Sequence, residues 1–329
     1  MLTLADWAKR LDGEGRVTQD IVELLSQTNE VLDDMLWQEG NLPTGHRLVM
    51  RTGLPTAYWR LLNQGVAVSK STTAQVDEQC GILEAWSEVD EALAKLNGDV
   101  NAFRLSEATA FIEAMNQEMA STTFYGNQSI SQEEFTGFSI RYSDTTAANG
   151  ANIVSGGGSG LDNSSIWLIT WGPQSAYGIF PKGTKAGLDH VDHGKQVIET
   201  AGGSAEGKRL TVLQEQWIWK CGLALKDWRY CVRIPNIDIS DLVANGASAA
   251  DLTQLMIKAI HRIPNLKMGR AAFYMNRSCF EFLDIQRRED VKDGGQLAYS
   301  NVDGLPVMSF RGIPIRKVDA LTEAEAAVS

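Results

Sequence analysis

Two histidines and two aspartates form the densest group of possible metal ligands in this chain, in the run Asp189-His-Val-Asp-His193. Imidazole nitrogens and carboxylate oxygens both bind zinc, and a zinc site needs three or four such ligands. Histidines at this spacing lack the His-Glu-x-x-His helix of metalloproteases, and no distant ligand of an obvious type completes the set. The run therefore favours a solvated polar loop, and we expect neither a metal site nor a cofactor.

Other patterns also fall short of an active site. The run Gly156-Gly-Gly-Ser-Gly160 has no Gly-Lys-Ser/Thr ending, so we interpret residues 147–165 as a flexible surface loop rather than a phosphate-binding loop. Carboxylates adjacent in sequence, such as Asp33-Asp34 and Glu133-Glu134, have side chains that point apart. A glycosidase pair of carboxylates could therefore form only from residues that the fold brings together. No cysteine or histidine suggests a nucleophile beside its base. We identify no catalytic residue and predict that the protein is not an enzyme.

The four cysteines are far apart and show no Cys-x-x-Cys spacing. Paired spacing is typical of zinc sites, and a reducing compartment disfavours disulfides. We therefore expect each of them to be a small buried apolar residue: Cys80, Cys221, Cys231 and Cys279. Cys221 and Cys231 are candidates for neighbours across a hairpin, without a bond between them.

A long helix is predicted from Phe103 to about Tyr125, and Gly126-Asn127 ends it because both residues tolerate positive φ. Its apolar residues recur at helical spacing and predict one buried face: Leu105, Ala108, Ile112, Met115 and Met119. Ala110, Phe111 and Ala114 add a second apolar flank. A helix with two apolar flanks is expected near the middle of a fold.

The remaining elements follow from periodicity and from turn residues. Helices are predicted over residues 18–37, 87–96, 248–263 and 277–286, the third beginning at Ser248 in a sequence similar to a capping box. Strands are predicted over residues 166–171, 271–275, 306–310 and 313–318, and a β-hairpin over 209–234. From Ala324 onward we expect a frayed tail.

Residues 46–80 are rich in Thr, Val, Ser and Gln, with Gly53, Pro55 and Gly65 as turn residues. We interpret them as an extended two-stranded arm, which is marginally stable in isolation. Its apolar residues Trp59, Leu61 and Leu62 need another surface to cover them. On the residues alone, that surface is either the arm's own domain or another subunit.

Tryptophan is frequent in the chain, with nine residues, several of them in the predicted hairpin. Such residues can form a stacking surface for sugars or bases. The alternation of Trp217, Trp219 and Cys221 instead favours a packed sheet. The stacking surface leaves an alternative function open, a cytosolic enzyme or carbohydrate-binding module.

Several segments, in their order and spacing, resemble the major capsid proteins of tailed phages. The end of the long helix, Ala120 to Phe138, is similar to the end of the spine helix in that family. The segments Asn41-Leu-Pro-Thr-Gly-His-Arg47, Asp227-Trp-Arg-Tyr230 and Phe310-Arg-Gly-Ile-Pro-Ile-Arg-Lys-Val-Asp319 resemble a podophage-type branch. The resemblance extends over residues 17 to 319.

This resemblance implies the Hong Kong 97-like capsid fold. That fold is α+β, with a long spine helix, mixed and mainly antiparallel sheets and an extended β-hairpin arm. The expected parts are an N-terminal arm and helix (1–40), an extended E-loop (41–85), a peripheral domain (86–146, completed by 291–329) and an axial domain (147–290).

The implied function is self-assembly, as hexamers and pentamers, into the icosahedral shell that encloses the phage genome. The implied partners are further copies of the chain and possible scaffolding, portal and cement proteins, around double-stranded DNA bound without sequence specificity. In that family the E-loop lies on a neighbouring subunit. The candidate inter-subunit contacts are therefore in the arm: Arg47, Arg51, Trp59, Arg60, Leu61, Leu62 and Lys70.

Composition agrees with these expectations. The chain has 329 residues and a net charge of −11, which disfavours a dedicated nucleic-acid binder but permits a shell around DNA. No run of about 18 apolar residues exists that would span a bilayer, and the start of the chain does not resemble a signal peptide. We expect assembly in the host cytoplasm and a final location in the virion capsid, with no membrane association.

Overall fold

The computed structural model describes residues 26–96, 99–199, 207–244, 249–290, 297–302 and 305–328. The strands are β1 (Trp37–Glu39), β2 (Gly45–Gly53), β3 (Thr72–Asp90), β4 (Asn163–Trp171), β5 (Ala176–Phe180), β6 (Leu188–Glu199), β7 (Arg209–Leu225), β8 (Cys231–Asp238), β9 (Arg270–Met275), β10 (Leu297–Val302), β11 (Leu305–Phe310) and β12 (Ile313–Lys317). The helices are α2 (Val31–Asp34), α3 (Glu91–Lys95), α4 (Val100–Tyr125), α5 (Phe138–Arg141), α6 (Ile239–Ala244), α7 (Leu252–Arg262) and α8 (Arg277–Asp290). Three short 3-10 turns are η1 (Gly150–Asn152), η3 (Trp228–Tyr230) and η4 (Leu266–Met268).

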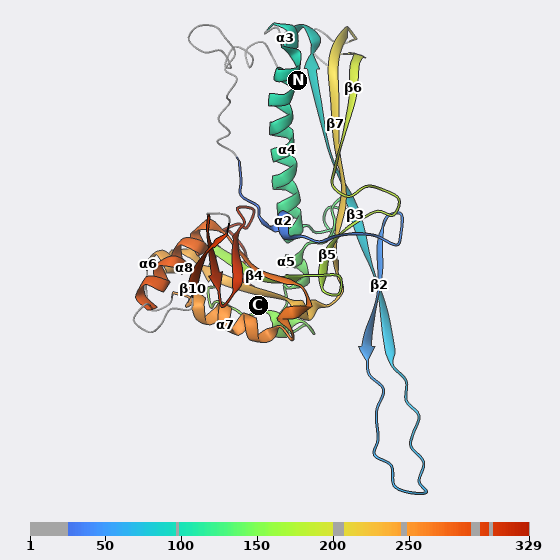
Figure 1. Ribbon diagram of the computed structural model, residues 1–329, viewed down its shortest axis with the longest axis vertical. Coiled ribbons are helices and arrows are strands. Elements are labelled where there is room, and N and C mark those ends of the chain that lie inside the picture. The colour runs from blue at the N-terminus through green and yellow to red at the C-terminus, as the bar shows by residue number, and fades with distance from the viewer. Residues whose placement is uncertain are drawn as a thin grey trace.

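The strands hydrogen-bond in the order β10-β11-β12-β9-β4-β5-β7-β3-β2, with β1, β6 and β8 paired off this path. Figure 1 shows three regions along this order. A body holds the C-terminal strands with α6, α7 and α8. The upright helix α4 lies beside the long strands β3, β6 and β7. A two-stranded arm, β2 and β3, projects beyond both.

Helix α4 confirms the predicted long helix and the position of its end, but Gly126 has a φ of −49°, so the predicted positive φ does not end the helix. Asp99 caps its start, because its carboxylate accepts the backbone N–H groups of Asn101 and Ala102, each at 3.0 Å. At the other end the Gly126 N–H donates to the Thr122 carbonyl at 2.9 Å. A Cβ at Gly126 would lie 2.4 Å from a backbone oxygen of the following loop, so only glycine lets the chain turn here.

The predicted buried face of α4 is wrong in its first half. Met115 and Met119 are buried, whereas Leu105 is 71% and Ile112 45% exposed. The sheet packs on a different flank, where Phe111 stacks on Trp217 of β7 with ring centroids 5.2 Å apart. The periodicity of apolar residues predicts that the helix has an apolar face, but it does not show which side of the helix another element covers.

The predicted hairpin over 209–234 is also wrong, although both of its strands exist. Strand β7 pairs with β3, β5 and β6, while β8 pairs with β4 in the body. The alternating apolar residues change from odd positions to even positions at Lys226-Asp227, and the chain crosses there from one part of the sheet to another. Strand β3 continues to Asp90, so the helix predicted from Ser87 shortens to α3.

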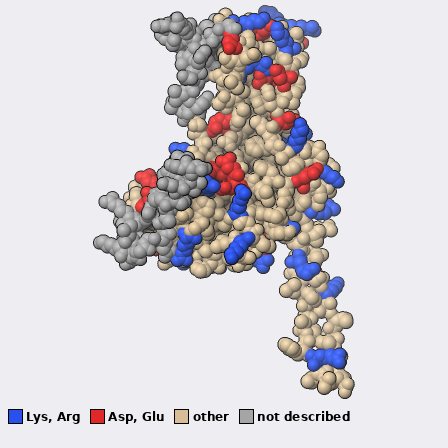
Figure 2. All heavy atoms as spheres, in the orientation of Figure 1, with Lys and Arg blue, Asp and Glu red and all other residues tan. Residues whose placement is uncertain are grey.

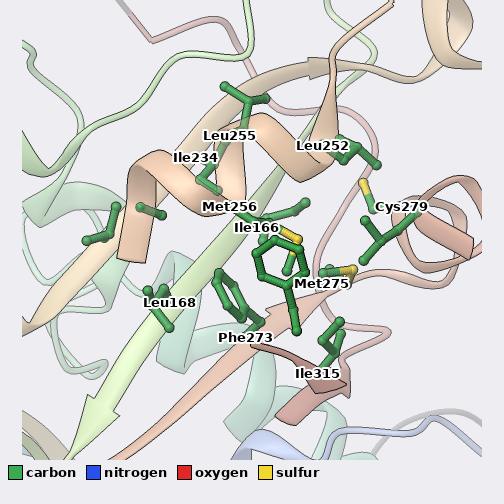
Figure 3. Close-up of a cluster of buried hydrophobic side chains, with 14 of the residues drawn as sticks. Ile166, Leu168, Ile234, Leu252, Leu255, Met256, Phe273, Met275, Cys279 and Ile315 are labelled. Atoms are coloured by element: carbon green, nitrogen blue, oxygen red, sulfur yellow. The ribbon is translucent and has the colours of Figure 1, made fainter. Parts of the chain in front are cut away.

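The body has an apolar core between its sheet and two helices. Strand β4 is buried along its whole length, as expected for residues 166–171. Figure 3 shows Leu252, Leu255 and Met256 of α7 above Phe273 and Met275 of β9, with Cys279 of α8 beside them. Asp251 caps α7, because its carboxylate accepts the Gln254 N–H at 2.9 Å, and Ser248, where the helix was predicted to begin, lies outside the described residues.

A second core joins the body to the end of α4. It packs large side chains from the two regions against each other: Met119, Phe124, Phe138, Tyr142, Trp167, Trp171 and Tyr274. Tyr142 donates from its hydroxyl to the Trp228 carbonyl at 2.6 Å, and Trp171 donates to the Tyr274 hydroxyl at 2.7 Å. The polar edges of Tyr142, Trp171 and Tyr274 are therefore paired inside the core, whereas the buried indole N–H of Trp167 has no hydrogen-bond partner among the described residues.

The C-terminal tail is ordered against the body, contrary to the prediction of fraying. Glu325 is buried and forms an ion pair with Arg233 at 2.8 Å. Its other oxygen accepts the Tyr125 hydroxyl at 2.5 Å, and Ser165 also donates to this carboxylate. Val328 exchanges two hydrogen bonds with Asn236. These contacts hold the tail across the joint between α4 and the body.

The structure differs from two further predictions, the flexible loop over residues 147–165 and the helix over residues 18–37. The segment 147–165, predicted as a flexible loop, contains η1 and the start of β4, and the Gly156 and Gly158 N–H groups each donate at 2.8 Å to carbonyls of β8. Of the helix predicted over 18–37, residues 18–25 lie outside the described residues. The rest holds only the short helix α2, followed by β1, which pairs with β5.

The four cysteines are unbonded and mostly buried, as predicted. All four are free, three are buried and Cys80 is half-buried. Cys221 and Cys231 are not cross-strand neighbours, because β7 and β8 do not pair. Burial raises the pKa of Cys80 to about 11 and that of Cys231 to about 12, so these thiols stay protonated at neutral pH.

Candidate assembly interface

The arm is an antiparallel ladder with an outer segment that lies beyond it. The register runs from Gly45 opposite Gln79 to Gly53 opposite Thr72, and residues 54–71 form the outer part without strand structure. The arm stands clear of the body and of α4 (Figure 1). This confirms the predicted two-stranded arm, although Leu48 near its root is buried against Tyr177 and Ile179 of β5 and Ala224 of β7.

The outer arm, which we define as residues 51–71, comprises the last three residues of β2 and the segment beyond the ladder, and it exposes large apolar side chains. Trp59 is 105% exposed, Leu62 89% and Leu61 69%, while Leu54 and Val68 are exposed as well. A contiguous apolar surface on a soluble protein marks a site of interaction. The arm does not fold back onto its own domain, so no surface of the described chain covers these residues.

The outer arm is also cationic, whereas the chain as a whole is acidic. Between Leu48 and Val76 the sequence contains Arg51, Arg60 and Lys70 and no aspartate or glutamate, in a chain of net charge −11. Figure 2 shows Lys and Arg along the arm and mixed charges over the rest of the visible face. None of the three cations forms an ion pair with another described residue.

Two ion pairs fix the root of the arm. Arg47 binds Asp77 across the ladder through two contacts of 2.7 Å, and this hydrogen-bonded partner lowers the pKa of Asp77. Arg141 of α5 binds the buried Glu78 at 2.5 and 2.7 Å. Arg47, one of the predicted contact residues, therefore has a partner within its own arm. Its position differs from that of the other six, which lie farther out.

A groove of about 770 Å³ lies where the arm leaves the body. One wall runs from Val49 in the outer half of β2 to Leu54 just beyond this strand, and the other is the turn from Lys226 to Arg229. Strand β2 is the last strand in the sheet order, so its outer edge is open to a further strand. Sequence reasoning missed this groove, because its walls are about 175 residues apart in the chain.

The two histidines of the Asp189–His193 run lie on strand β6, not in the predicted polar loop. His190 stacks on Trp217 and His193 on Trp86, with ring centroids 5.2 Å apart in both pairs. Within the described ranges no three His, Cys, Asp or Glu side chains gather in a group able to hold a metal ion.

The subunit thus combines an upright helix beside a long sheet, a separate body and a projecting arm. A family model described as major capsid protein GP7 matches residues 12–329. The chain belongs to this major capsid protein family. Its members are structural proteins and not enzymes, so the alternative of an enzyme or carbohydrate-binding module is not supported. No curated protein sequence matches this capsid protein.

A search of solved structures matches this capsid protein to several phage structures. A chain from the near-atomic structure of bacteriophage Epsilon15 is 28% identical, with a TM-score of 0.78, and the match covers 100% of this chain and 97% of that one. A chain of Mycobacterium phage Adephagia is 11% identical, with a TM-score of 0.42, over 69% of this chain and 92% of that one. The capsid of Myoviridae phage XM1 gives 10% identity and a TM-score of 0.41, over 67% and 96%.

These findings confirm the predicted resemblance, the α+β capsid fold and the location in the phage virion. The capsid protein carries Arg51, Trp59, Arg60, Leu61, Leu62 and Lys70 together on its outer arm. Among the described residues, no helix has both the length and the apolarity to cross a membrane.

Proposed function

We propose that the outer arm of each capsid protein lies on a neighbouring subunit and that this contact holds the shell together. The single observation that carries the proposal is the full exposure of Trp59 on an arm with a fixed root. The proposed contact residues on the outer arm are Arg51, Trp59, Arg60, Leu61, Leu62 and Lys70, with Arg47 at the root.

Burial of the apolar residues supplies the proposed binding energy. A large apolar side chain contributes about 1.5 to 3 kcal/mol when it passes from full exposure to full burial. Trp59, Leu61 and Leu62 are all well exposed, so each gains most of that amount in a contact. The ion pairs of Arg47 and Arg141 already order the root, which lowers the entropy lost on association.

The charge of the arm supports a contact with another copy of the same chain. Three unpaired cations on the arm face a protein whose remaining residues are strongly acidic. Complementary charge of this kind sets register and association rate more than affinity. Arg51, Arg60 and Lys70 would then meet acidic surfaces of the adjacent subunit.

Many such contacts would build hexamers and pentamers of an icosahedral shell around double-stranded DNA, without sequence-specific binding. Modest contacts repeated around a closed shell add to a large total. Scaffolding, portal and cement proteins are the further proposed partners, and the host cytoplasm is the proposed place of assembly. The proposed parts of the subunit are 1–40, 41–85, 86–146 with 291–329, and 147–290.

The test replaces residues 54–71 by a short Asn-Gly turn that joins β2 directly to β3. The ladder and both root ion pairs stay in place, so the subunit is expected to fold with an unchanged circular dichroism spectrum. We expect no shells by sedimentation and negative-stain microscopy. The matched control Thr73→Ala changes an exposed side chain of the retained ladder, outside the proposed contact residues, and should still assemble. Closed shells of normal size from the shortened arm would refute the proposal.

A further inference from the structure

A basic surface follows α7 and the turn after it. Between Asp251 and Glu281 the sequence contains no aspartate or glutamate, although the whole chain has a net charge of −11. Figure 1 shows α7 on the lower side of the body, away from the upright helix α4. Four exposed cations of this stretch form what we call the basic patch: Lys258, Arg262, Lys267 and Arg270.

The fold holds the basic patch on ordered backbone. One side of α7 is buried in the core of the body, and Lys258 and Arg262 lie on its exposed side, about 6 Å apart along the helix axis. The Asn265 side chain orders the turn after the helix, because it accepts the Lys267 N–H at 2.9 Å. Arg270 is the first residue of β9, which pairs with β4. A helix, a capped turn and a strand therefore set the backbone positions of all four cations.

The fold itself gains little from these four charges. None of them forms an ion pair with another described residue, whereas Arg277, the next cation along the chain, binds Asp319 at 2.6 Å. Lys258 and Arg262 repel each other, because like charges at i and i+4 are neighbours on a helix surface. The helix dipole favours a cation in the last turn but does not reach the two cations beyond it. Charges without a structural role in an acidic protein indicate a ligand of opposite charge.

This surface offers few apolar anchors to a protein partner. Within residues 252–280, all of which the structure describes, Met268 is the one large apolar side chain with substantial exposure, at 43%. The centre of a protein–protein interface is normally apolar and poor in charge. Lysine and arginine side chains, in contrast, are sufficient to bind phosphates, because these contacts need no fit to base edges. The basic patch therefore suits a nucleic-acid backbone better than a protein surface.

We propose that the basic patch binds the phosphate backbone of double-stranded DNA, without sequence specificity, on the inner side of the shell. A duplex carries a phosphate about every 3.4 Å along each strand, so several phosphates lie within reach of the four cations. The acidic remainder of the protein keeps the contact weak and reversible. The inference rests on the proposed shell around double-stranded DNA and does not depend on the contact of the arm.

The first test measures DNA binding by the unassembled full-length protein. The probe is a fluorescein-labelled duplex of about 20 base pairs and mixed sequence, and its anisotropy is recorded over about 50 to 200 mM NaCl. Each phosphate contact contributes about −0.9 to the slope of log K against the logarithm of the salt concentration. We expect Lys258→Gln with Arg262→Gln to make this slope less steep by about 1.8. Equal slopes in the wild type and in this variant would overturn the proposal.

Matched variants separate the basic patch from net charge. Arg60→Gln with Lys70→Gln also removes one arginine and one lysine, but from the outer arm, and should leave the slope unchanged. A change equal to that of the patch variant would show that net charge alone governs binding and would overturn the site. Lys267→Gln with Arg270→Gln should repeat the effect of the first patch variant. Stronger competition by poly-glutamate than by unlabelled duplex would indicate an acidic protein partner and would overturn the DNA site.

The second test asks which side of the shell the basic patch faces. Met268→Cys is treated with a maleimide on a polyethylene glycol chain too large to enter a closed shell, and the wild type corrects for the four native cysteines. We expect labelling of the unassembled protein but not of filled particles. Efficient labelling of closed particles would place the basic patch outside and overturn the proposal.

Assembly of the patch variant distinguishes this inference from the proposed contact of the arm. Lys258→Gln with Arg262→Gln should form shells like those of the wild type by negative-stain microscopy. Loss of shells in this variant would show that the basic patch is a subunit contact and would overturn the DNA site. A wild type without shells would refute the proposed function, while the first test would still decide whether the basic patch binds DNA.

Discussion

The buried ion pair between Arg233 and Glu325 makes a sharp prediction about stability. The two side chains are 5% and 4% exposed, and their charged atoms lie 2.8 Å apart. Arg233 also donates to the Tyr142 carbonyl at 2.9 Å and to the Ser165 hydroxyl at 3.1 Å. Among these partners of Arg233, Glu325 is the one carboxylate. Glu325→Ala removes it and leaves the positive charge of Arg233 buried.

The expected loss is large compared with the stability of a domain. Removal of one partner from a buried ion pair costs about 3 to 5 kcal/mol, because the remaining charge stays desolvated. Domains are stable by roughly 5 to 15 kcal/mol, so this is a substantial part of the total. With a urea dependence near 3 kcal/mol per M, the unfolding midpoint should fall by roughly 1 to 2 M.

The assay is urea unfolding of the unassembled protein, followed by tryptophan fluorescence. The control Glu323→Ala removes an exposed carboxylate from the same tail and should shift the midpoint far less. The double variant Arg233→Met with Glu325→Leu replaces the pair by apolar groups and should recover most of the loss. If Glu325→Ala unfolded at the wild-type urea concentration, the tail would not be held by this pair.

Three further predictions concern α4 and its surroundings. Met115→Asp buries an unpaired carboxylate and should abolish soluble, native-like protein by circular dichroism, whereas Glu118→Lys on the exposed side should fold normally; a soluble Met115→Asp protein would contradict the burial of this face. Hydrogen bonds from Lys195 and Lys95 lower the pKa of Glu91 to about 2. The ionised carboxylate therefore stabilises the folded state fully above its unfolded pKa of about 4.5, and this stabilisation is lost as the pH falls through about 2. Acid unfolding of Glu91→Gln should lack this part of the pH dependence, and identical curves would exclude it. Gly137→Ala should lower the thermal midpoint, since its Cβ would lie 2.6 Å from a backbone oxygen of α4, and an unchanged midpoint would show that the loop can shift.

Features set by neighbouring residues were predictable from the sequence. The end of α4 at Gly126 and the ladder of the arm both follow from local pattern, and both are present. The sequence alone therefore placed the candidate contact residues together on one arm. The sequence pattern did not give the register of the arm, in which Gly45 lies opposite Gln79 and Gly53 opposite Thr72.

Features set by distant residues were not predictable in the same way. Alternation identified β7 and β8 as strands but could not show that β4 lies beside β8. The acidic, alanine-rich tail looks disordered by composition, yet Arg233, 92 residues away, holds Glu325 in the core. In both cases the deciding interaction joins segments far apart in the chain, which local periodicity does not encode.

Strand β3 has a mechanical consequence for the whole particle. Its 19 residues form one half of the arm and continue as the strand that lies between β2 and β7 in the sheet order. A pull on the arm is therefore directed along β3, parallel to the strand and perpendicular to its hydrogen bonds with β7. Eleven residue pairs, from Cys80 to Asp90, are then loaded together in shear rather than opened one after another. If pressure inside a filled particle pulls on the arm, all the hydrogen bonds between β3 and β7 resist the pull together. The sheet beside α4 then holds the arm in place.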